Sequence, residues 1–221
     1  MKQIKACIFD AYGTLFDVNA ACRELSNEVG HNWESLASLW RLRQVEYTWL
    51  RNSMDEYIDF WQITSHALDY AMETLEIDNI KLKQELLALY LKLEAYPEVK
   101  DLLTKLKQKG FKTGILSNGS MKMLNSAVDN ANIRELLDQI LSVDECKTYK
   151  PSKKVYDLVE KIMKVKKENV MFFSSNAWDM HAASNYGFNT IWVNRFNAKL
   201  EKLPGKPINI VNSLEKIDEI I

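Results

Sequence analysis

Four short apolar runs constrain the fold more than any other feature of this sequence. They cover residues 4–9, 113–116, 170–173 and 190–193. None of them alternates between apolar and polar residues, and a helical pattern follows each, as expected of parallel strands that are buried on both faces. Helices are expected at residues 98–109, 121–131, 152–164 and 177–186. This order predicts an α/β fold with a doubly wound, mostly parallel sheet.

Two weaker runs suggest additional elements. Residues 139–143 and 208–211 are short and apolar enough to form further strands, and a last helix is expected at residues 214–220.

The segment at residues 18–95 has a different pattern. It contains no proline, and its apolar residues recur at helical spacing, which predicts a helical insertion after the first strand. Pro97 marks the start of the next core helix, because proline is tolerated at a helix start. We therefore expect a helical cap domain at 18–95 and a core domain made of 1–17 and 96–221.

One helix of this cap has apolar residues around most of its circumference. Residues 33–52 include Trp40, Trp49 and Leu50, which point in different directions on a helix. We expect this helix to be buried on several faces and to form a subunit interface in a homodimer.

Charge and cysteine content narrow the class of protein. The 221 residues include 29 basic and 30 acidic ones, which is a typical balance for a soluble globular protein and argues against nucleic acid as a partner. No apolar stretch approaches the length of a signal peptide or a membrane span, so no membrane partner is expected. Three cysteines without motif spacing, Cys7, Cys22 and Cys146, favour the reducing cytoplasm over a disulfide framework or a zinc site.

Polar clusters follow three of the four main strands. Because ligands collect at the carboxyl ends of strands in open α/β sheets, these side chains are expected to meet in one crevice. Helix capping is the alternative explanation for each cluster taken alone. The clusters are Asp10; Ser117 with Asn118; and Ser174, Ser175 and Asn176.

These residues resemble a known family. The segments DAYGTLFD (10–17), SNGS (117–120) and SSNAWD (174–179), together with Lys150-Pro151, resemble the haloacid dehalogenase superfamily, in which the first Asp is a covalent nucleophile. Most members are phosphatases with a second Asp two residues later, where this chain has Tyr12. The stretch WRLRQVEYTWLR (40–51) and the pattern DxYGT are similar to the narrower L-2-haloacid dehalogenase group.

The resemblance implies a HAD-like core with a helical cap and a specific set of site residues. It assigns the nucleophile to Asp10, the halide site to Arg41 with Asn118, and water activation to Asp179, held by Asn176 and a contact from Ser174 to Lys150. The full catalytic set expected is Asp10, Thr14, Arg41, Ser117, Asn118, Lys150, Tyr156, Ser174, Asn176 and Asp179. The substrate-binding set expected is Tyr12, Leu42, Phe60, Ser117, Asn118 and Trp178.

The chemistry of these residue types agrees with that assignment. An Asp is ionised at neutral pH, so Asp10 can displace a halide without a metal. A guanidinium offers several donors to the leaving halide, and Ser117 and Thr14 suit the substrate carboxylate and an oxygen of Asp10. Lys150 precedes a proline, which disfavours helix and leaves its ammonium on a loop. No cofactor and no metal site are expected.

Each of these residues also has a plainer interpretation. Arg41 could form an exposed ion pair with Glu34, Lys150 could be a surface lysine, and the aromatic residues could be ordinary core. At the level of function, the expectation is hydrolysis of short L-2-haloalkanoic acids. The alternatives are a Mg²⁺-dependent phosphatase of the same fold and a protein that has lost turnover and binds a partner through its cap.

Overall fold

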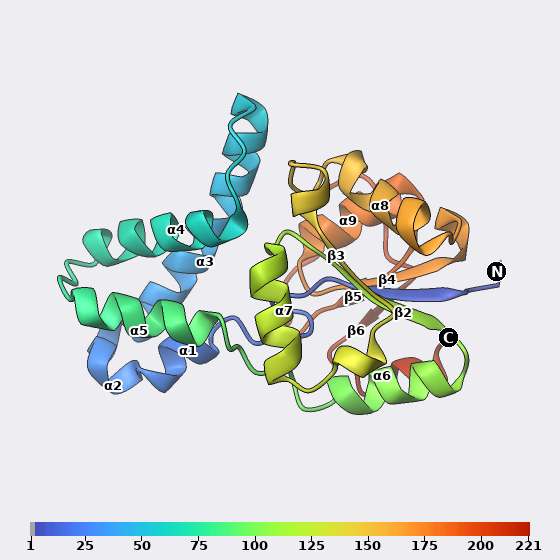
Figure 1. The fold of residues 1–221 in the computed structure, drawn as a ribbon, viewed down its shortest axis with the longest axis horizontal. Helices are drawn as coiled ribbons and strands as arrows, with labels where there is room; N and C mark the ends of the chain where they lie inside the picture. Colours follow the sequence, from blue (N-terminus) through green and yellow to red (C-terminus); the bar gives the residue numbers. More distant parts are fainter. Residues whose placement is uncertain (1–2) are drawn as a thin grey trace.

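A parallel sheet flanked by helices forms the right-hand part of the molecule in Figure 1. Within residues 3–221, which the computed structural model describes, six strands pair in the order β3-β2-β1-β4-β5-β6, and every neighbouring pair is parallel. This confirms the doubly wound α/β class and both weaker strand predictions. The strands are β1 (Ala6–Phe9), β2 (Lys112–Ser117), β3 (Gln139–Ser142), β4 (Val170–Ser174), β5 (Asn189–Val193) and β6 (Asn209–Val211).

The order of the strands creates a crevice at the carboxyl end of β1. From β1 the chain builds β2 and β3 on one side, then crosses to β4 on the other, so the connections diverge beside β1. Phe9 is level with Ile115 of β2 and Phe173 of β4. The residues that follow these three strands therefore emerge together at one edge of the sheet.

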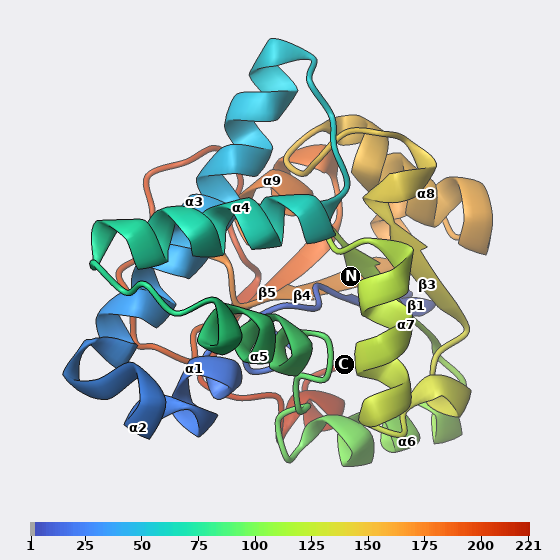
Figure 2. The same cartoon turned by 60° about the vertical axis from the view of Figure 1, so that its left-hand side comes forward.

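Helices cover both faces of the sheet. Figures 1 and 2 show α6 and α7 on one face and α8 and α9 on the other, as right-handed crossovers require when the chain changes direction. The predicted core helices are confirmed to within one residue at each end. Their bounds are α6 (Val99–Gln108), α7 (Met121–Asn130), α8 (Lys153–Met163) and α9 (Ala177–Tyr186).

The predicted last helix at 214–220 is wrong. Only a short 3₁₀ turn, Ile217–Glu219, forms there, with Leu214 and Ile217 buried. The N–H of Ile217 donates to the carbonyl of Leu214, so a tight turn brings both apolar side chains to the core without a full helix. A seven-residue segment is also too short to gain much from helix propagation.

Five helices lie beside the carboxyl edge of the sheet (Figure 1). Asp59 and Asn79 cap α4 and α5 by accepting hydrogen bonds from first-turn backbone N–H groups, which explains where those helices begin. Trp40 of α3 donates its indole N–H to the carbonyl of Thr64 in α4 at 2.9 Å. The bounds are α1 (Ala20–Glu24), α2 (Ser26–Val29), α3 (Trp33–Met54), α4 (Phe60–Thr74) and α5 (Ile80–Tyr90).

The chain enters and leaves these helices at one place. Phe16 forms an antiparallel bridge with Ala95, and the N–H of Tyr96 donates to the carbonyl of Leu15 at 2.9 Å. The two connections therefore run side by side and fix where α1–α5 sit relative to β1.

The expectation that α3 is buried on several faces is wrong within this chain. Its buried side chains lie on one face, against the other cap helices, whereas Leu42 and Leu50 are 52% and 50% exposed. The cap helices are too few to surround α3, and its C-terminal end projects from the molecule (Figures 1 and 2).

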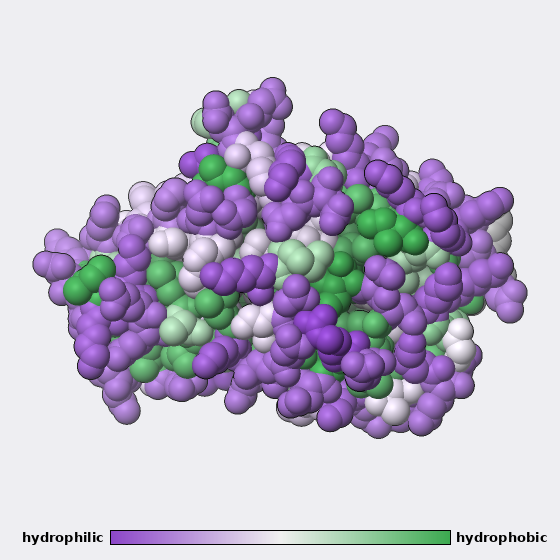
Figure 3. Space-filling model, in the orientation of Figure 1, coloured by the Kyte–Doolittle hydropathy of each residue, from purple (hydrophilic) through white to green (hydrophobic). Residues whose placement is uncertain are grey.

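The space-filling view shows a mostly hydrophilic face with hydrophobic patches across its middle (Figure 3). None of the helices in residues 3–221 is long and apolar enough to cross a bilayer.

Candidate active site

Asp10 leaves the end of β1 and is held by donors on both carboxylate oxygens. Its side chain lies in the crevice, and the residue is only 6% exposed. Oδ1 accepts from Nζ of Lys150 at 3.1 Å, while Oδ2 accepts from Oγ1 of Thr14 at 3.0 Å and Nδ2 of Asn176 at 2.8 Å. These contacts compensate a negative charge and hold the carboxylate in one orientation.

Lys150 is fully buried between two carboxylates, so the surface-lysine alternative is wrong. Its Nζ donates to Oδ1 of Asp10 and, at 2.7 Å, to Oδ2 of Asp179. Burial opposes the charge of this ammonium, but the attraction of Asp10 and Asp179 prevails and raises the pKa of Lys150. The lysine therefore stays charged at neutral pH.

The loop that carries Lys150 is fixed by two asparagines. Asn118 accepts from the Lys150 backbone N–H at 2.9 Å through Oδ1. Asn52 of α3 donates to the carbonyl of Tyr149 at 2.8 Å and accepts from its N–H at 2.9 Å. The role of Asn52 was missed from the sequence, because nothing local links position 52 to position 149.

Asp179 lies in the first turn of α9, fully buried behind Lys150. It accepts from the hydroxyl of Tyr156 at 2.7 Å and of Ser174 at 3.2 Å. Burial raises the pKa of Asp179 to about 6, against the opposing effect of Lys150 and with a further increase from Asp10. Two carboxylates thus share one ammonium.

Two expected contacts around Asp179 are wrong in detail. Ser174 donates to Asp179 and not to Lys150, because the hydroxyl at the end of β4 faces the first turn of α9. Asn176 holds Asp10 instead of Asp179. It directly precedes α9, and its Nδ2 donates to Asp10 and to the carbonyl of Tyr12.

Arg41 reaches the crevice from α3. Its guanidinium donates to Oε1 of Gln44 at 2.8 Å, and to the carbonyl of Tyr12 and Oδ1 of Asn176 at 3.2 Å each. The alternative ion pair with Glu34 is therefore wrong. Arg41 comes from a helix outside the sheet and contacts Tyr12 and Asn176, which belong to the core. It brings positive charge beside the candidate nucleophile.

A buried polar chain within the cap orients Arg41. Gln44 donates to the hydroxyl of Thr64 at 2.8 Å and accepts from the hydroxyl of Tyr90 at 3.1 Å. Sequence reasoning missed Gln44. The available signal was a glutamine three residues after Arg41, where a helix places neighbouring side chains on the same face.

Asp10 and Arg41 line a small cavity of about 20 Å³, whereas Lys150 and Asp179 lie outside its lining. Leu42 does not line it and lies on the exposed side of α3, so its expected place in the substrate pocket is wrong. Val45 lines it instead, because a residue four positions after Arg41 shares its helix face and the next residue does not. The lining residues are Asp10, Tyr12, Arg41, Val45, Phe60, Ser117, Asn118, Asn176 and Trp178.

Positive charge at this site comes from side chains. In residues 3–221 no group of three or more His, Cys, Asp or Glu residues is placed to hold a metal ion. The donors around Asp10 are an ammonium, a hydroxyl and an amide, with the guanidinium of Arg41 beside Asn176. Such a set suits carboxylate and halide anions.

The amino-acid sequence matches a known protein family over most of its length. The family model for haloacid dehalogenase-like hydrolases matches residues 4–187. (S)-2-haloacid dehalogenase 1 from Pseudomonas sp. (strain CBS-3) is 44% identical over 222 residues, covering 100% of this chain and 98% of the relative.

Two solved structures match over nearly the whole chain. A dehalogenase with an intermediate complex is 40% identical with a TM-score of 0.98, covering 100% of this chain and 98% of the other. L-2-haloacid dehalogenase from Xanthobacter autotrophicus with chloropropionic acid covalently bound is 31% identical with a TM-score of 0.92, covering 99% and 98%.

Replacing Lys150 by methionine is expected to destabilise the fold in a pH-dependent way. The change leaves Asp10 and Asp179 buried without their cation, which costs about 3 to 5 kcal/mol at pH 8. Without the cation the pKa of Asp179 rises further, so the folded state binds more protons than the unfolded state and regains stability as pH falls from 8 to 5. Urea unfolding at both pH values measures this.

The exposed Lys154 on α8 provides the matched control. Lys154→Met removes the same charge without uncovering a buried carboxylate, so its unfolding free energy should stay within about 0.5 kcal/mol of the parent. A Lys150→Met loss that is equal at pH 5 and pH 8 would contradict the shared-ammonium arrangement.

Proposed function

The chain belongs to the haloacid dehalogenase-like hydrolases and, within them, to the (S)-2-haloacid dehalogenase family, and from that premise we propose that it hydrolyses short L-2-haloalkanoic acids to D-2-hydroxy acids and halide. One observation carries this proposal. A buried carboxylate, Asp10, faces a small cavity together with the guanidinium of Arg41. The family comparisons support this reaction over the phosphatase alternative.

In the first step, Asp10 attacks C2 of the substrate from the side opposite the halogen. A bond forms between a carboxylate oxygen and C2, and the carbon–halogen bond breaks with its electron pair leaving on the halide. The configuration at C2 inverts and an aspartyl ester results. Arg41 and Asn118 receive the halide, and Ser117 binds the substrate carboxylate.

In the second step, water attacks the carbonyl carbon of the Asp10 ester. Asp179 accepts the proton, for which a carboxylate with a pKa of about 6 is suited, since it is ionised at neutral pH yet basic enough to take a proton. The bond from the carbonyl carbon to the substrate oxygen then breaks, that oxygen takes up the proton held by Asp179, and the regenerated Asp10 carboxyl releases the second proton of the water to solvent. The hydroxy acid leaves with C2 untouched, so the inverted configuration is kept.

The remaining polar residues position these groups. Tyr156 and Ser174 hold Asp179 through its two oxygens, and Thr14 holds Asp10. Lys150 stabilises negative charge on the Asp10 oxygens in both steps. Burial raises the pKa of Tyr156 well above its usual value, so its hydroxyl remains a donor.

The organisation of the chain supports the same proposal. We take residues 18–95 as a cap that carries Arg41 over a core made of 1–17 and 96–221.

We also propose that the protein is located in the cytoplasm, since its three cysteines lack the spacing of a disulfide framework.

The first test is release of chloride from the two enantiomers of 2-chloropropionate in the presence of EDTA. Chloride release is expected from the L enantiomer only and should yield D-lactate. It should persist in EDTA, because Lys150 and Arg41 supply the positive charge without a metal. The measurement combines a halide assay with chiral analysis of lactate. Activity that disappears with EDTA and returns with Mg²⁺, together with cleavage of a phosphomonoester, would support a phosphatase instead.

Arg41→Lys should retain the fold but lose most of the halide release. A compact ammonium replaces a fork of donors, and the loss of a charge-assisted bond of ~2 to 3 kcal/mol in the transition state corresponds to roughly 30- to 150-fold in rate. Arg43→Lys, on the same helix but paired with Glu46, is the matched control and should keep nearly full activity. Equal rates in the two variants would remove Arg41 from the halide site.

We also propose that two copies associate through the exposed side of α3. Leu42, Leu50 and Met54 are 52%, 50% and 64% exposed, and their spacing of eight and four residues places them along one side of the helix. A second copy presents the same stripe, so a two-fold contact can bury both. Apolar side chains clustered in this way on a charged surface are typical of an interface.

Light scattering at micromolar concentration is expected to give the mass of a dimer. Leu50→Glu should shift the mass toward the monomer, because it places a charge in the contact. Ile80→Glu, at an exposed apolar position on α5, should leave the dimer intact. A monomeric parent protein would refute the association.

A further inference from the structure

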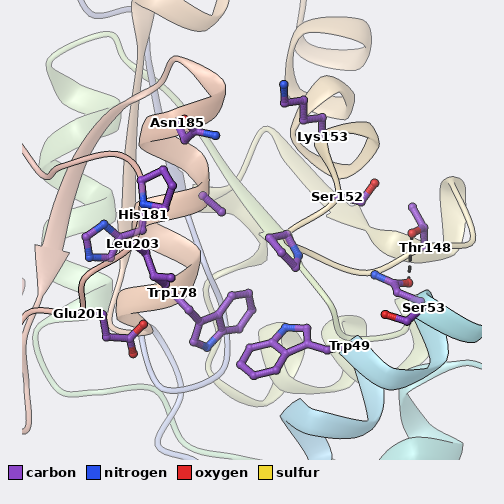
Figure 4. Close-up of a pocket in the computed structure, with 14 residues that line it drawn as sticks. Trp49, Ser53, Thr148, Ser152, Lys153, Trp178, His181, Asn185, Glu201 and Leu203 are labelled. Carbon is purple, nitrogen blue, oxygen red and sulfur yellow. Dashed lines mark hydrogen bonds between the residues drawn. The ribbon is translucent and has the colours of Figure 1, made fainter.

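A second and larger cavity lies outside the site, between α3 and the core (Figure 4). Its volume is about 890 Å³. Apolar walls come from both tryptophans in Figure 4 and from prolines, an alanine and a leucine, whereas Lys153 and Glu201 lie among the polar residues. The apolar lining residues are Trp49, Pro151, Trp178, Ala182, Leu203 and Pro204.

The outer cavity and the site cavity share a lining residue. Trp178 at the start of α9 lines both of them. Along α3, Arg41 and Val45 line the site cavity and Trp49 lines the outer one, and their four-residue spacing places the three side chains in one row. The row leads from the proposed halide site past Trp178 into the outer cavity.

The two tryptophans meet at the boundary between the cavities. The rings of Trp49 and Trp178 contact edge to face, with centroids 5.3 Å apart and planes at 87°. Figure 4 shows the two rings side by side at one end of the outer cavity. Trp49 belongs to α3 and Trp178 to α9, so their contact joins the cap to the core.

The site cavity has little spare room behind this boundary. Its volume of about 20 Å³ is close to the space needed by one water molecule. The proposed substrate places its carboxylate and halogen among polar residues, which leaves the C2 alkyl group against Val45, Phe60 and Trp178. A movement of Trp178 toward the outer cavity would give an alkyl chain of several carbons room to extend.

Resting on the proposed function, we propose that Trp49 limits the length of the substrate's alkyl chain by holding Trp178 across this passage. The outer cavity is then the place where the alkyl chain of a longer 2-haloalkanoic acid would lie. Trp49 does not line the site cavity, so it acts through Trp178 as a positioning residue for chain-length selectivity. Its removal frees one face of Trp178 and lets that ring move toward the outer cavity.

The test compares kcat/KM for bromide release from L-2-bromohexanoate and L-2-bromopropionate. The ratio of the two values is expected to rise at least about tenfold in Trp49→Ala. Each buried methylene is worth roughly fourfold in binding, so the three additional methylenes of the hexanoate allow up to about sixtyfold. A general loss of stability would lower both values and leave their ratio unchanged.

Trp33→Ala is the matched control, because Trp33 is a half-buried tryptophan at the other end of α3 and lines neither cavity. Its ratio should equal that of the parent protein. Trp49→Leu keeps an apolar side chain on α3 and should raise the ratio in the same direction even if the alanine variant fails to fold.

Failure of this inference and failure of the proposed function give different results. An unchanged ratio in a folded Trp49 variant that still dehalogenates the propionate would overturn the role of Trp49, as would an equal rise in Trp33→Ala. Failure of the parent protein to release bromide from either substrate would overturn the proposed function itself.

Discussion

The buried ammonium of Lys150 is the interaction on which the rest of the site depends. It contacts Asp10 at the end of β1 and Asp179 in the first turn of α9, at 3.1 and 2.7 Å. Burying two carboxylates is costly unless a cation and further donors satisfy them. The pairing of β1 with β4 makes this arrangement possible, because it brings the end of β1 beside the start of α9. The fold and the charge arrangement therefore support each other.

The other charged group, Arg41, comes from the cap, and one amide joins it to the core. Asn176 donates from Nδ2 to Asp10 and accepts at Oδ1 from Arg41, so the same side chain orients the proposed nucleophile and the proposed halide site. Contacts from Asn52 to Tyr149 and from Tyr57 to Asp144 hold the cap against the core nearby. The geometry for displacement thus depends on how the cap meets the sheet, which is also where the Trp49 and Trp178 rings touch.

Sequence reasoning was most successful where one local pattern determined the outcome. Continuous apolar runs bounded by polar residues predicted all six strands, and helical periodicity predicted the core helices. It failed where the outcome depended on distant parts of the chain. The family resemblance implied that Leu42 lines the pocket, although in this chain the helix turns Leu42 toward solvent and brings Val45 inward. Asn52 contacts Tyr149, 97 residues away, and Gln44 contacts Thr64, 20 residues away. No spacing rule reveals these two contacts, whereas the contact of Gln44 with Arg41 follows from helical spacing.

The central claim is that Asp10 attacks carbon, and oxygen labelling in a single turnover tests it most directly. With enzyme in excess over L-2-chloropropionate in heavy-oxygen water, mass spectrometry should find the first D-lactate mostly unlabelled, because its new oxygen comes from the Asp10 carboxylate. Solvent oxygen enters that carboxylate when water cleaves the ester, so a peptide containing Asp10 should gain the label. Labelled first-turnover lactate with unlabelled Asp10 would contradict the account, since it would mean that water attacks C2 directly.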